Sequence, residues 1–242
     1  MQINTLNRLL DINRQFYQSF GKDFSATRRR LQPGVQRVLK RLTGEERILD
    51  LGCGNGELAR QLALADHRGS YLGLDFSSSL LALAEDQPAT FPVKFLQVDL
   101  TSPDWEVAIA QEKFDLVFSF AAFHHIPGLE LRLQFLKKIH RLLNGSGSFI
   151  HSHWQFLNSP RLKDRIQPWQ TIGIDPEDLD PGDYLLDWKH GGYGLRYVHH
   201  FSEEELVQLA ESTGFQVMES FLSDGKGGNL SLYQVWKLDK NA

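Results

Sequence analysis

An acidic residue and three evenly spaced glycines separate a short apolar run from a helical pattern. Asp50 ends the apolar run, and the glycines that follow it are Gly52, Gly54 and Gly56. The run predicts a buried strand, and the apolar spacing over residues 57–65 predicts a helix. Glycine lets the backbone turn sharply and approach a ligand closely, which a Cβ would prevent. The pattern therefore predicts a nucleotide-binding turn between the strand and the helix.

The charge of Asp50 restricts what this turn can bind. In dinucleotide-binding folds the glycines are spaced Gly-x-Gly-x-x-Gly, and the helix N-terminus holds a pyrophosphate. Here the spacing is Gly-x-Gly-x-Gly, and a carboxylate at the mouth of the turn would repel a phosphate. The same carboxylate suits a ligand with a cationic head, such as the amino group of an amino acid. The spacing and the charge together argue against a dinucleotide-dependent dehydrogenase.

Acidic residues also end the next two predicted strands. Asp75 follows an apolar run, and Asp99 lies near the end of the predicted strand at residues 93–100. Asp75 could accept two hydrogen bonds from a ribose diol, or it could cap a helix over residues 77–85. Phe76 could cover one face of a purine, and Asp99 could accept a hydrogen bond from the exocyclic amine of adenine.

The three acids form one constellation, because ligands of open α/β sheets bind beyond the carboxyl ends of the strands. One acid suits a cation, one a diol and one an amine, and a nucleoside joined to an amino acid carries all three groups. S-adenosylmethionine is such a molecule, and we predict that it is the cofactor. We also assign Leu100 and Phe120, at the ends of the third and fourth predicted strands, to the cofactor site.

The segment from residue 48 to residue 150 resembles the class I S-adenosylmethionine-dependent methyltransferases. The resemblance rests on the glycine turn, the three acids and the predicted strands that follow the turn, which are residues 71–75, 93–100, 114–120 and 148–150. It implies a doubly wound, Rossmann-like α/β fold with a seven-stranded, mostly parallel sheet whose last strand is antiparallel. The predicted strand pair at residues 216–223 and 231–236 agrees with this expectation.

We expect one domain built from four segments, which are an N-terminal helical cap (residues 1–45), a cofactor-binding α/β core (46–150), a substrate-binding insertion (151–200) and a C-terminal helix with a strand pair that completes the sheet (201–242). The cap is predicted to contain two helices, the first of which ends at Gly21. Tyr17 and Arg28 would lie near the carboxylate of the cofactor, as parts of a lid.

Methyl transfer from a sulfonium is an in-line displacement, so the protein must position the nucleophile and exclude water. A carboxylate is already ionised at neutral pH and needs only orientation, for which an arginine fork such as Arg196 is well shaped. A hydroxyl or an acidic carbon would need a base within reach, and His125 is the candidate. Alternatively, His124 and His125 form a hydrogen-bonded wall beside the cofactor. Tyr193 or Tyr197 could stack on a flat substrate.

Three short motifs are similar to one subfamily, the tRNA wobble-uridine methyltransferases that esterify 5-carboxymethyluridine. The motifs are Phe24-Ser25-x-Thr27-Arg28, His124-His125 and Arg196-Tyr197-x-His199. The resemblance implies carboxylate O-methylation, with Tyr17 and Arg28 serving the cofactor and with Arg196, Tyr197 and His199 serving the modified base. The chain departs from the pattern where Leu31-Gln32-Pro33 replaces Trp-Pro. In eukaryotes this subfamily uses a small activator partner, and the sequence reveals no surface for one.

The composition narrows the remaining possibilities. A net charge of −4 over 242 residues argues against strong nonspecific binding of nucleic acid, although basic residues between Arg28 and Arg41 could contact tRNA phosphates. The single cysteine, an N-terminus without a signal profile and the lack of a membrane span predict a cytoplasmic protein. No metal site is expected. The alternative to tRNA is a small metabolite methylated with a histidine base, and a remoter one is a cofactor-binding protein without turnover.

Overall fold

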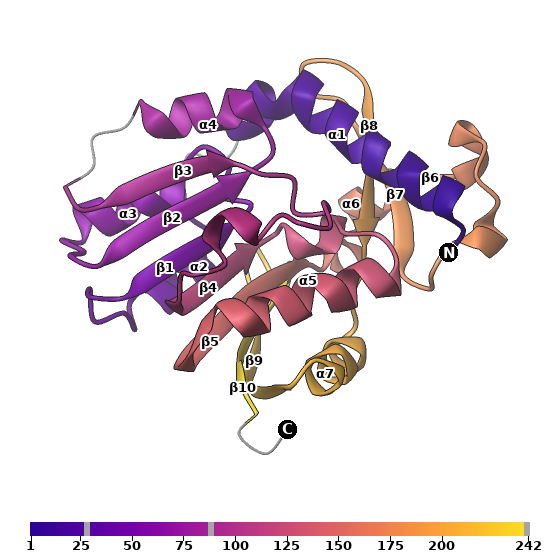
Figure 1. Ribbon diagram of the computed structural model, residues 1–242. Coiled ribbons are helices and arrows are strands. Elements are labelled where there is room, and N and C mark those ends of the chain that lie inside the picture. Colours follow the sequence, from indigo (N-terminus) through magenta and orange to yellow (C-terminus); the bar gives the residue numbers. More distant parts are fainter. Residues whose placement is uncertain (27–29, 87–89, 240–242) are drawn as a thin grey trace.

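A seven-stranded sheet forms the centre of the molecule in the computed structural model, which describes residues 1–26, 30–86 and 90–239 (Figure 1). The strand order is β3-β2-β1-β4-β5-β10-β9. The strands are β1 (Arg47–Leu51), β2 (Ser70–Asp75), β3 (Val93–Gln97), β4 (Phe114–Phe120), β5 (Leu143–Trp154), β9 (Phe215–Ser223) and β10 (Ser231–Leu238). Strands β1 to β5 pair in parallel, and β10 is antiparallel to both of its neighbours. The predicted fold class is confirmed.

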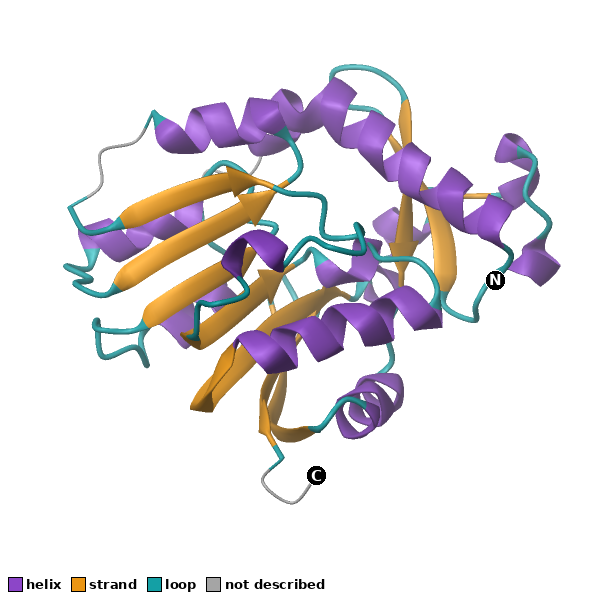
Figure 2. Ribbon diagram, in the orientation of Figure 1, coloured by secondary structure: helices purple, strands orange, loops and turns teal. Residues whose placement is uncertain are grey.

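Helices cover both faces of this sheet, as Figure 2 shows. Adjacent residues of a strand point to opposite faces, so Leu49 of β1 packs in one apolar core and Ile48 in the other. The first core receives α5 (Leu129–Leu142) and α7 (Glu203–Ser212). The second receives α2 (Pro33–Leu39), α3 (Glu57–Leu64) and α4 (Ser78–Glu85). Burial on both faces explains why the central strands read as continuous apolar runs.

The first helix is longer than predicted. Helix α1 (Ile3–Ala26) continues through Gly21 instead of ending there. A Cβ at Gly21 would lie 3.3 Å from Oγ of Ser79, at the start of α4. The glycine therefore allows two helices to pass closely, and it does not act as a stop signal. Figure 1 shows α1 extending from α4 across the molecule to the insertion.

The insertion forms a second, smaller sheet. Its three antiparallel strands have the order β6-β7-β8, which are β6 (Ile166–Gln167), β7 (Asp183–Trp188) and β8 (Gly194–His199). Short helical turns surround them, namely α6 (Pro160–Lys163), η3 (Phe156–Asn158), η4 (Trp169–Ile172) and η5 (Pro176–Asp178). Helix α1 packs on this sheet, with Leu9 buried against Tyr197. The remaining short turns are η1 (Val107–Ile109) and η2 (Phe123–His125).

Strand β5 begins earlier than the sequence suggested. It runs from Leu143 through Gly145-Ser146-Gly147, where its register against β4 shifts, and the predicted strand at residues 148–150 is its middle part. Ser202 caps the start of α7, because its hydroxyl accepts a hydrogen bond from the backbone N–H of Glu205 at 3.1 Å. In the part of the chain that the structure describes, no helix combines the length and the apolarity needed to cross a membrane.

Candidate active site

The glycine turn after β1 needs glycine at the positions that the sequence singled out. Gly52 has φ of 86°, and a Cβ there would lie 2.5 Å from the Cβ of Ala122. Gly56 has φ of 72°, and a Cβ there would meet Ala84 at 2.8 Å. The left-handed backbone and the close neighbours both exclude larger residues. The turn can therefore present backbone groups to a ligand at close range.

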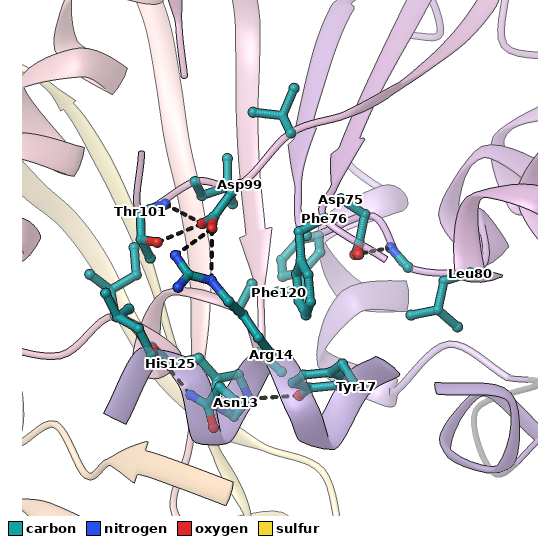
Figure 3. Close-up of a pocket in the computed structure, with 18 of the residues that line it drawn as sticks. Asn13, Arg14, Tyr17, Asp75, Phe76, Leu80, Asp99, Thr101, Phe120 and His125 are labelled. Carbon is teal, nitrogen blue, oxygen red and sulfur yellow. Dashed lines mark hydrogen bonds and ion pairs between the residues drawn. The ribbon is translucent and has the colours of Figure 1, made fainter. Parts of the chain in front are cut away.

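A cavity of about 250 Å3 opens beside this turn, beyond the carboxyl ends of β1, β2 and β4, and Figure 3 shows it at close range. Side chains from α1 reach into it from one side and strand ends from the other. We call it the first cavity, and its lining includes Asn13, Arg14, Tyr17, Gly52, Gly54, Asp75, Phe76, Asp99, Leu100, Phe120 and His125. The predicted cofactor-side residues Phe76, Leu100 and Phe120 are therefore brought together. Gly56 lies behind the cavity, in the turn itself.

Asp75 is held at the end of β2 by backbone donors. The N–H groups of Gly54 and Ser77 donate to its two carboxyl oxygens, each at 2.9 Å. Burial raises the pKa of Asp75, and these hydrogen bonds act against that shift. Each carboxyl oxygen has two acceptor sites, so Asp75 can still accept hydrogen bonds from a diol in the cavity.

Asp99 makes an ion pair that the sequence did not indicate. Arg14 donates to its Oδ2 from Nε at 3.1 Å and from Nη2 at 2.8 Å, as Figure 3 shows. The backbone N–H and the hydroxyl of Thr101 donate to Oδ1. Burial alone would raise the pKa of Asp99, but the Thr101 hydrogen bonds and the Arg14 charge outweigh it and lower the pKa. Helical periodicity places Arg14 on α1 but says nothing about a partner 85 residues away.

A second cavity of about 360 Å3 adjoins the first one. The two share part of their lining, which consists of Tyr17, Gly52, Asn55, Phe120, Ala121 and His125. Asp50 and Arg196 line only the second cavity. A ligand that extends from Asp99 and Asp75 to Asp50 must therefore pass this shared junction. The second cavity therefore gives a reacting group access to the middle of such a ligand.

Asp50 lies at the mouth of the turn, as predicted, but it is buried. Its carboxyl is 4% exposed and accepts a hydrogen bond of 2.6 Å from the Tyr71 hydroxyl. Burial raises the pKa of Asp50 to about 7, the Tyr71 hydrogen bond acts against this, and the charge of Asp75 adds to it. A cationic amino group arriving in the second cavity would favour the ionised carboxylate.

His125 is fixed at the junction by two hydrogen bonds. Its Nδ1 lies 2.9 Å from the backbone carbonyl oxygen of Tyr197, and its Nε2 lies 2.8 Å from the Tyr17 hydroxyl. A carbonyl only accepts, so Nδ1 carries the proton, and Nε2 of the neutral ring accepts from Tyr17. This supports the interpretation of a hydrogen-bonded wall. It also leaves a histidine–tyrosine pair that could move a proton at the junction.

Arg196 lies in the second cavity among aromatic rings. The residue is 3% exposed. Its guanidinium carbon lies 4.8 Å from the ring centre of Trp154 and 5.4 Å from that of Phe16. The cation is therefore presented to the cavity in a setting largely shielded from water. An anionic group that enters the cavity would meet it there.

The structure corrects the prediction that Tyr197 and His199 contact the substrate. Successive side chains of β8 alternate between faces, so Tyr197 and His199 point away from Arg196. Both are fully buried, and neither lines either cavity. Asp183 Oδ1 lies 2.7 Å from the Tyr197 hydroxyl and 2.6 Å from Nδ1 of His199. The pattern Arg-Tyr-x-His therefore places one residue in the site and two in a structural network.

Arg28 and His124 are two further residues that the sequence singled out. Arg28 lies outside the described residues. His124 is buried beside His125, and its Nδ1 accepts from the backbone N–H of Trp154 at 3.4 Å. Among the described residues, no group of three histidine, cysteine, aspartate or glutamate side chains is arranged to hold a metal ion.

The chain is similar to known methyltransferases in sequence and in fold. Residues 48–147 match the family described as "Methyltransferase domain". A relative in Schizosaccharomyces pombe, a tRNA (carboxymethyluridine(34)-5-O)-methyltransferase, is 27% identical over 222 residues, which cover 85% of this chain and 89% of the relative. A protein of Encephalitozoon cuniculi that is named as a methyltransferase is 28% identical and covers 85% of this chain and 87% of its own length. The solved structure of the DhpI–SAH complex has a TM-score of 0.66 at 18% identity, covers 97% of this chain and 98% of its own, and shows the same fold.

Proposed function

We propose that this class I S-adenosylmethionine-dependent methyltransferase transfers a methyl group to a carboxylate oxygen of a modified wobble uridine in tRNA. The observation that carries the proposal is the position of Arg196. It is a buried arginine in the cavity that adjoins the cofactor cavity, next to their shared junction. A carboxylate paired with this fork would lie beside the point where the methyl group must be presented.

The chain offers a site that fits the cofactor along its whole length. Asp99 and Asp75 suit the adenine amine and the ribose diol, and Asp50 suits the cationic amino group. The glycine turn leaves room for backbone contact where a Cβ would collide. When bound, the sulfonium supplies an electrophilic methyl group. The residues of the chain have to hold the acceptor in line with it and keep water out.

A carboxylate nucleophile agrees with the state of the histidines at the junction. The Nε2 lone pair of His125 already accepts from Tyr17 at 2.8 Å, and its Nδ1 is committed to a backbone carbonyl. An ionised carboxylate needs no base, only neutralisation and orientation by Arg196. Trp154 and Trp188, whose ring centres lie within 6 Å of the Arg196 guanidinium carbon, exclude water from this pair.

The choice of a modified uridine is supported by similarity. The S. pombe relative, of which 89% is covered by the match, is named as a methyltransferase of carboxymethyluridine in tRNA. The aromatic walls of the second cavity would accept a flat base. A uridine with a carboxymethyl group combines the flat ring and the carboxylate that this cavity suits.

A second candidate is the methylation of a hydroxyl or an acidic carbon on a small metabolite. The Tyr17–His125 pair favours it, because Nε2 of His125 faces the junction of the two cavities. Loss of a substrate proton to this imidazole would leave a cation beside Tyr17. This mechanism depends on pH through the imidazole, whereas esterification of an ionised carboxylate does not.

Label transfer from methyl-labelled S-adenosylmethionine to tRNA that lacks the wobble ester tests the proposal. We expect label that mild alkali removes, because an ester is hydrolysed and a methylated nitrogen, carbon or ribose oxygen is not. An Arg196→Lys variant should bind the cofactor normally in a calorimetric titration and lose about 100-fold in kcat/KM, since an ammonium cannot replace the fork. Alkali-stable label, or no label with cofactor still bound, would contradict esterification. If no label is transferred while the cofactor still binds, small carboxylic and phenolic acceptors are tested next.

A further inference from the structure

Most arginines of the described part of the chain form an ion pair with a carboxylate. The arginines that pair with a carboxylate are Arg14, Arg37, Arg41, Arg47, Arg60, Arg68, Arg132, Arg141 and Arg165. Arg8, Arg30 and Arg161 differ, because no carboxylate of a described residue lies at ion-pair distance from any of the three. Arg8 lines neither cavity, whereas Arg30 and Arg161 both line the second one. An acidic chain thus leaves two exposed cations unneutralised at the mouth of its substrate cavity.

The acids that line the same cavity are occupied elsewhere. Asp50 accepts from the Tyr71 hydroxyl, and Glu57 pairs with Arg60. Asp224 is buried and accepts from the backbone N–H of Gly34 at 2.9 Å and from the Tyr233 hydroxyl at 2.7 Å. No lining carboxylate is therefore positioned to neutralise the two arginines at the mouth.

The insertion holds Arg161 at this position. Leu162, its neighbour in α6, is 4% exposed and packs in the small core with Leu186 and Val198 of the insertion sheet. One turn further, Arg165 donates from Nε to Asp187 Oδ1 at 3.1 Å. These contacts fix α6 against β7 and β8, and they thereby hold the backbone of Arg161 beside the second cavity.

The arginines of the cavity also differ in depth. Arg196 is nearly fully buried, whereas Arg30 and Arg161 are exposed at the opening. A buried arginine suits one carboxylate that is fully removed from water, and exposed arginines suit an anion that keeps part of its hydration. A phosphate group is such an anion, and arginine forks match its geometry.

We propose that Arg30 and Arg161 form a phosphate-binding subsite at the mouth of the second cavity, so that the substrate is a phosphorylated nucleoside and not a free carboxylic acid. The inference rests on the proposed function, because it places the carboxylate on Arg196 and the phosphate of the same or the adjoining nucleotide at the mouth. The subsite raises affinity for the substrate and takes no part in methyl transfer itself.

Calorimetric titration with uridine 3′,5′-bisphosphate tests the subsite without requiring turnover. The titration is done with the full chain saturated with S-adenosylmethionine, and uridine serves as the probe without phosphate. We expect the bisphosphate to bind more tightly than uridine, and Arg161→Gln to weaken its binding about tenfold, as for the loss of one charge-assisted hydrogen bond. Arg30→Gln should act in the same direction.

Arg68→Gln is the matched control. Arg68 is exposed, pairs with Glu45 and lines neither cavity, so its loss changes the net charge equally without touching the subsite. Equal binding of the bisphosphate to the wild type, Arg161→Gln and Arg68→Gln would overturn the inference. So would equal binding of uridine and its bisphosphate to the wild type.

The methylation assay separates this inference from the proposed function. With 5-carboxymethyluridine and its bisphosphate as substrates, Arg161→Gln should raise KM for the phosphorylated form alone and leave kcat unchanged. If neither compound nor tRNA is methylated while the bisphosphate still needs Arg161 to bind, esterification is wrong and the phosphate subsite stands. If both are methylated equally well by Arg161→Gln and wild type, the subsite is wrong and esterification stands.

Discussion

Asp50 is the residue whose ionisation decides how the unliganded protein receives its cofactor. Its carboxyl is buried against Tyr71 beside the glycine turn, and burial raises its pKa from the ordinary 3.8 to about 7. The neighbouring Cys53 thiol does not titrate in this range, because burial raises its pKa well above the usual value. Near neutral pH the free protein is therefore a mixture of protonated and ionised Asp50.

Affinity for S-adenosylmethionine should consequently fall as the pH is lowered below about 7. A cationic amino group binds the ionised carboxylate, so binding at pH 6 must release the proton that Asp50 carries. The expected decrease approaches tenfold per pH unit below the pKa. Calorimetric titration at pH 5.5 to 8.5 in two buffers of different ionisation enthalpy measures both the affinity and the proton release. Asp50→Asn should bind weakly and lose this dependence, and an affinity that is flat from pH 5.5 to 8.5 in the wild type would contradict the assignment.

The same pKa shift has the opposite sign for the stability of the unliganded fold. Because the folded pKa lies above the unfolded one, the fold favours protonated Asp50. The contribution of this group is therefore present at acidic pH and is lost as the pH rises from about 4 to about 7. Cofactor binding and stability thus make opposite demands on one carboxyl, as expected of a residue kept for its function.

At the residue scale the sequence predicts the cofactor side better than the substrate side. Asp75, Phe76 and Asp99 could be recognised because each lies at or just beyond the carboxyl end of a parallel strand, which is the ligand edge of the fold. Tyr197 and His199 could not be assigned correctly, since a short motif does not reveal which face of a strand each side chain occupies. A one-residue difference in position moves a side chain from the cavity to the core.

Helix α1 is the element that connects the two cavities. Its Tyr17 and Arg14 reach His125 and Asp99, and Ser25 accepts a hydrogen bond of 2.8 Å from the side-chain amide of Asn55 in the glycine turn. Its apolar face packs on the insertion, where the rings of Phe16 and Trp188 lie 5.7 Å apart. The sequence predicted a helix here but not its length or its partners, because these contacts are all remote along the chain.

Asn13 holds this arrangement together and provides a test of it. Its side-chain oxygen accepts from the Tyr197 N–H at 2.8 Å, and its Nδ2 donates to the His125 carbonyl at 3.3 Å. It thereby sets the distance between His125 at the junction and Arg196, the neighbour of Tyr197. Asn13→Asp keeps the acceptor but places a carboxylate oxygen against the His125 carbonyl.

We expect Asn13→Asp to reduce kcat about tenfold and to destabilise the fold by about 1–3 kcal/mol, as for an unsatisfied buried polar group. Steady-state kinetics and urea unfolding measure the two effects. Gln15→Ala, on the exposed face of the same helix, controls for changes in α1 itself. Destabilisation with unchanged kcat would mean that Asn13 is purely structural.

The insertion sheet is tied to α5 and α7 by a buried charge network. Asp183 of β7 accepts from Arg132 of α5, from Tyr197 and from His199, whose Nε2 lies 2.9 Å from Oε1 of Glu205 in α7. Arg132 itself is 1% exposed. Removing one partner would leave a buried charge without compensation, which costs more than the pair contributes.

Asp183→Asn should therefore destabilise the protein by about 3–5 kcal/mol, far more than a surface substitution. Urea unfolding at neutral pH measures the change in free energy. The control is Asp164→Asn, which removes the same charge from an exposed position in the same insertion. If both variants lose less than about 1 kcal/mol, the network contributes no more than exposed ion pairs do.

At the scale of the whole molecule, the resemblance to class I methyltransferases was sufficient to predict the central sheet. It was not sufficient to predict the structure of the insertion. The mostly parallel seven-stranded sheet with its antiparallel last strand could be expected, because the glycine turn and the acids carry the resemblance that implies it. The insertion, rich in proline, glycine and tryptophan, gave no periodicity from which its three strands could be predicted. Its sheet depends on pairing between residues 166–199 and on the packing of α1, which are tertiary effects.

The consequence of this architecture is that cofactor binding should order α1 more than it orders the rest of the molecule. Arg14, Tyr17 and Asn13 face the first cavity, so a ligand there contacts the core strands and the helix at the same time. Saturation at about 100 times Kd stabilises the folded state by roughly 2.7 kcal/mol.

Hydrogen exchange with and without S-adenosylmethionine measures this effect. The slowing should be largest in the C-terminal half of α1 and in the glycine turn. It should be smallest in α7, which lies on the other side of α5 and contacts neither cavity. An Asp75→Asn variant, in which the diol acceptor is weakened, should need a higher cofactor concentration for the same protection. Equal slowing of α1 and α7 would mean that the cofactor stabilises the molecule only as a whole and that α1 does not close over it.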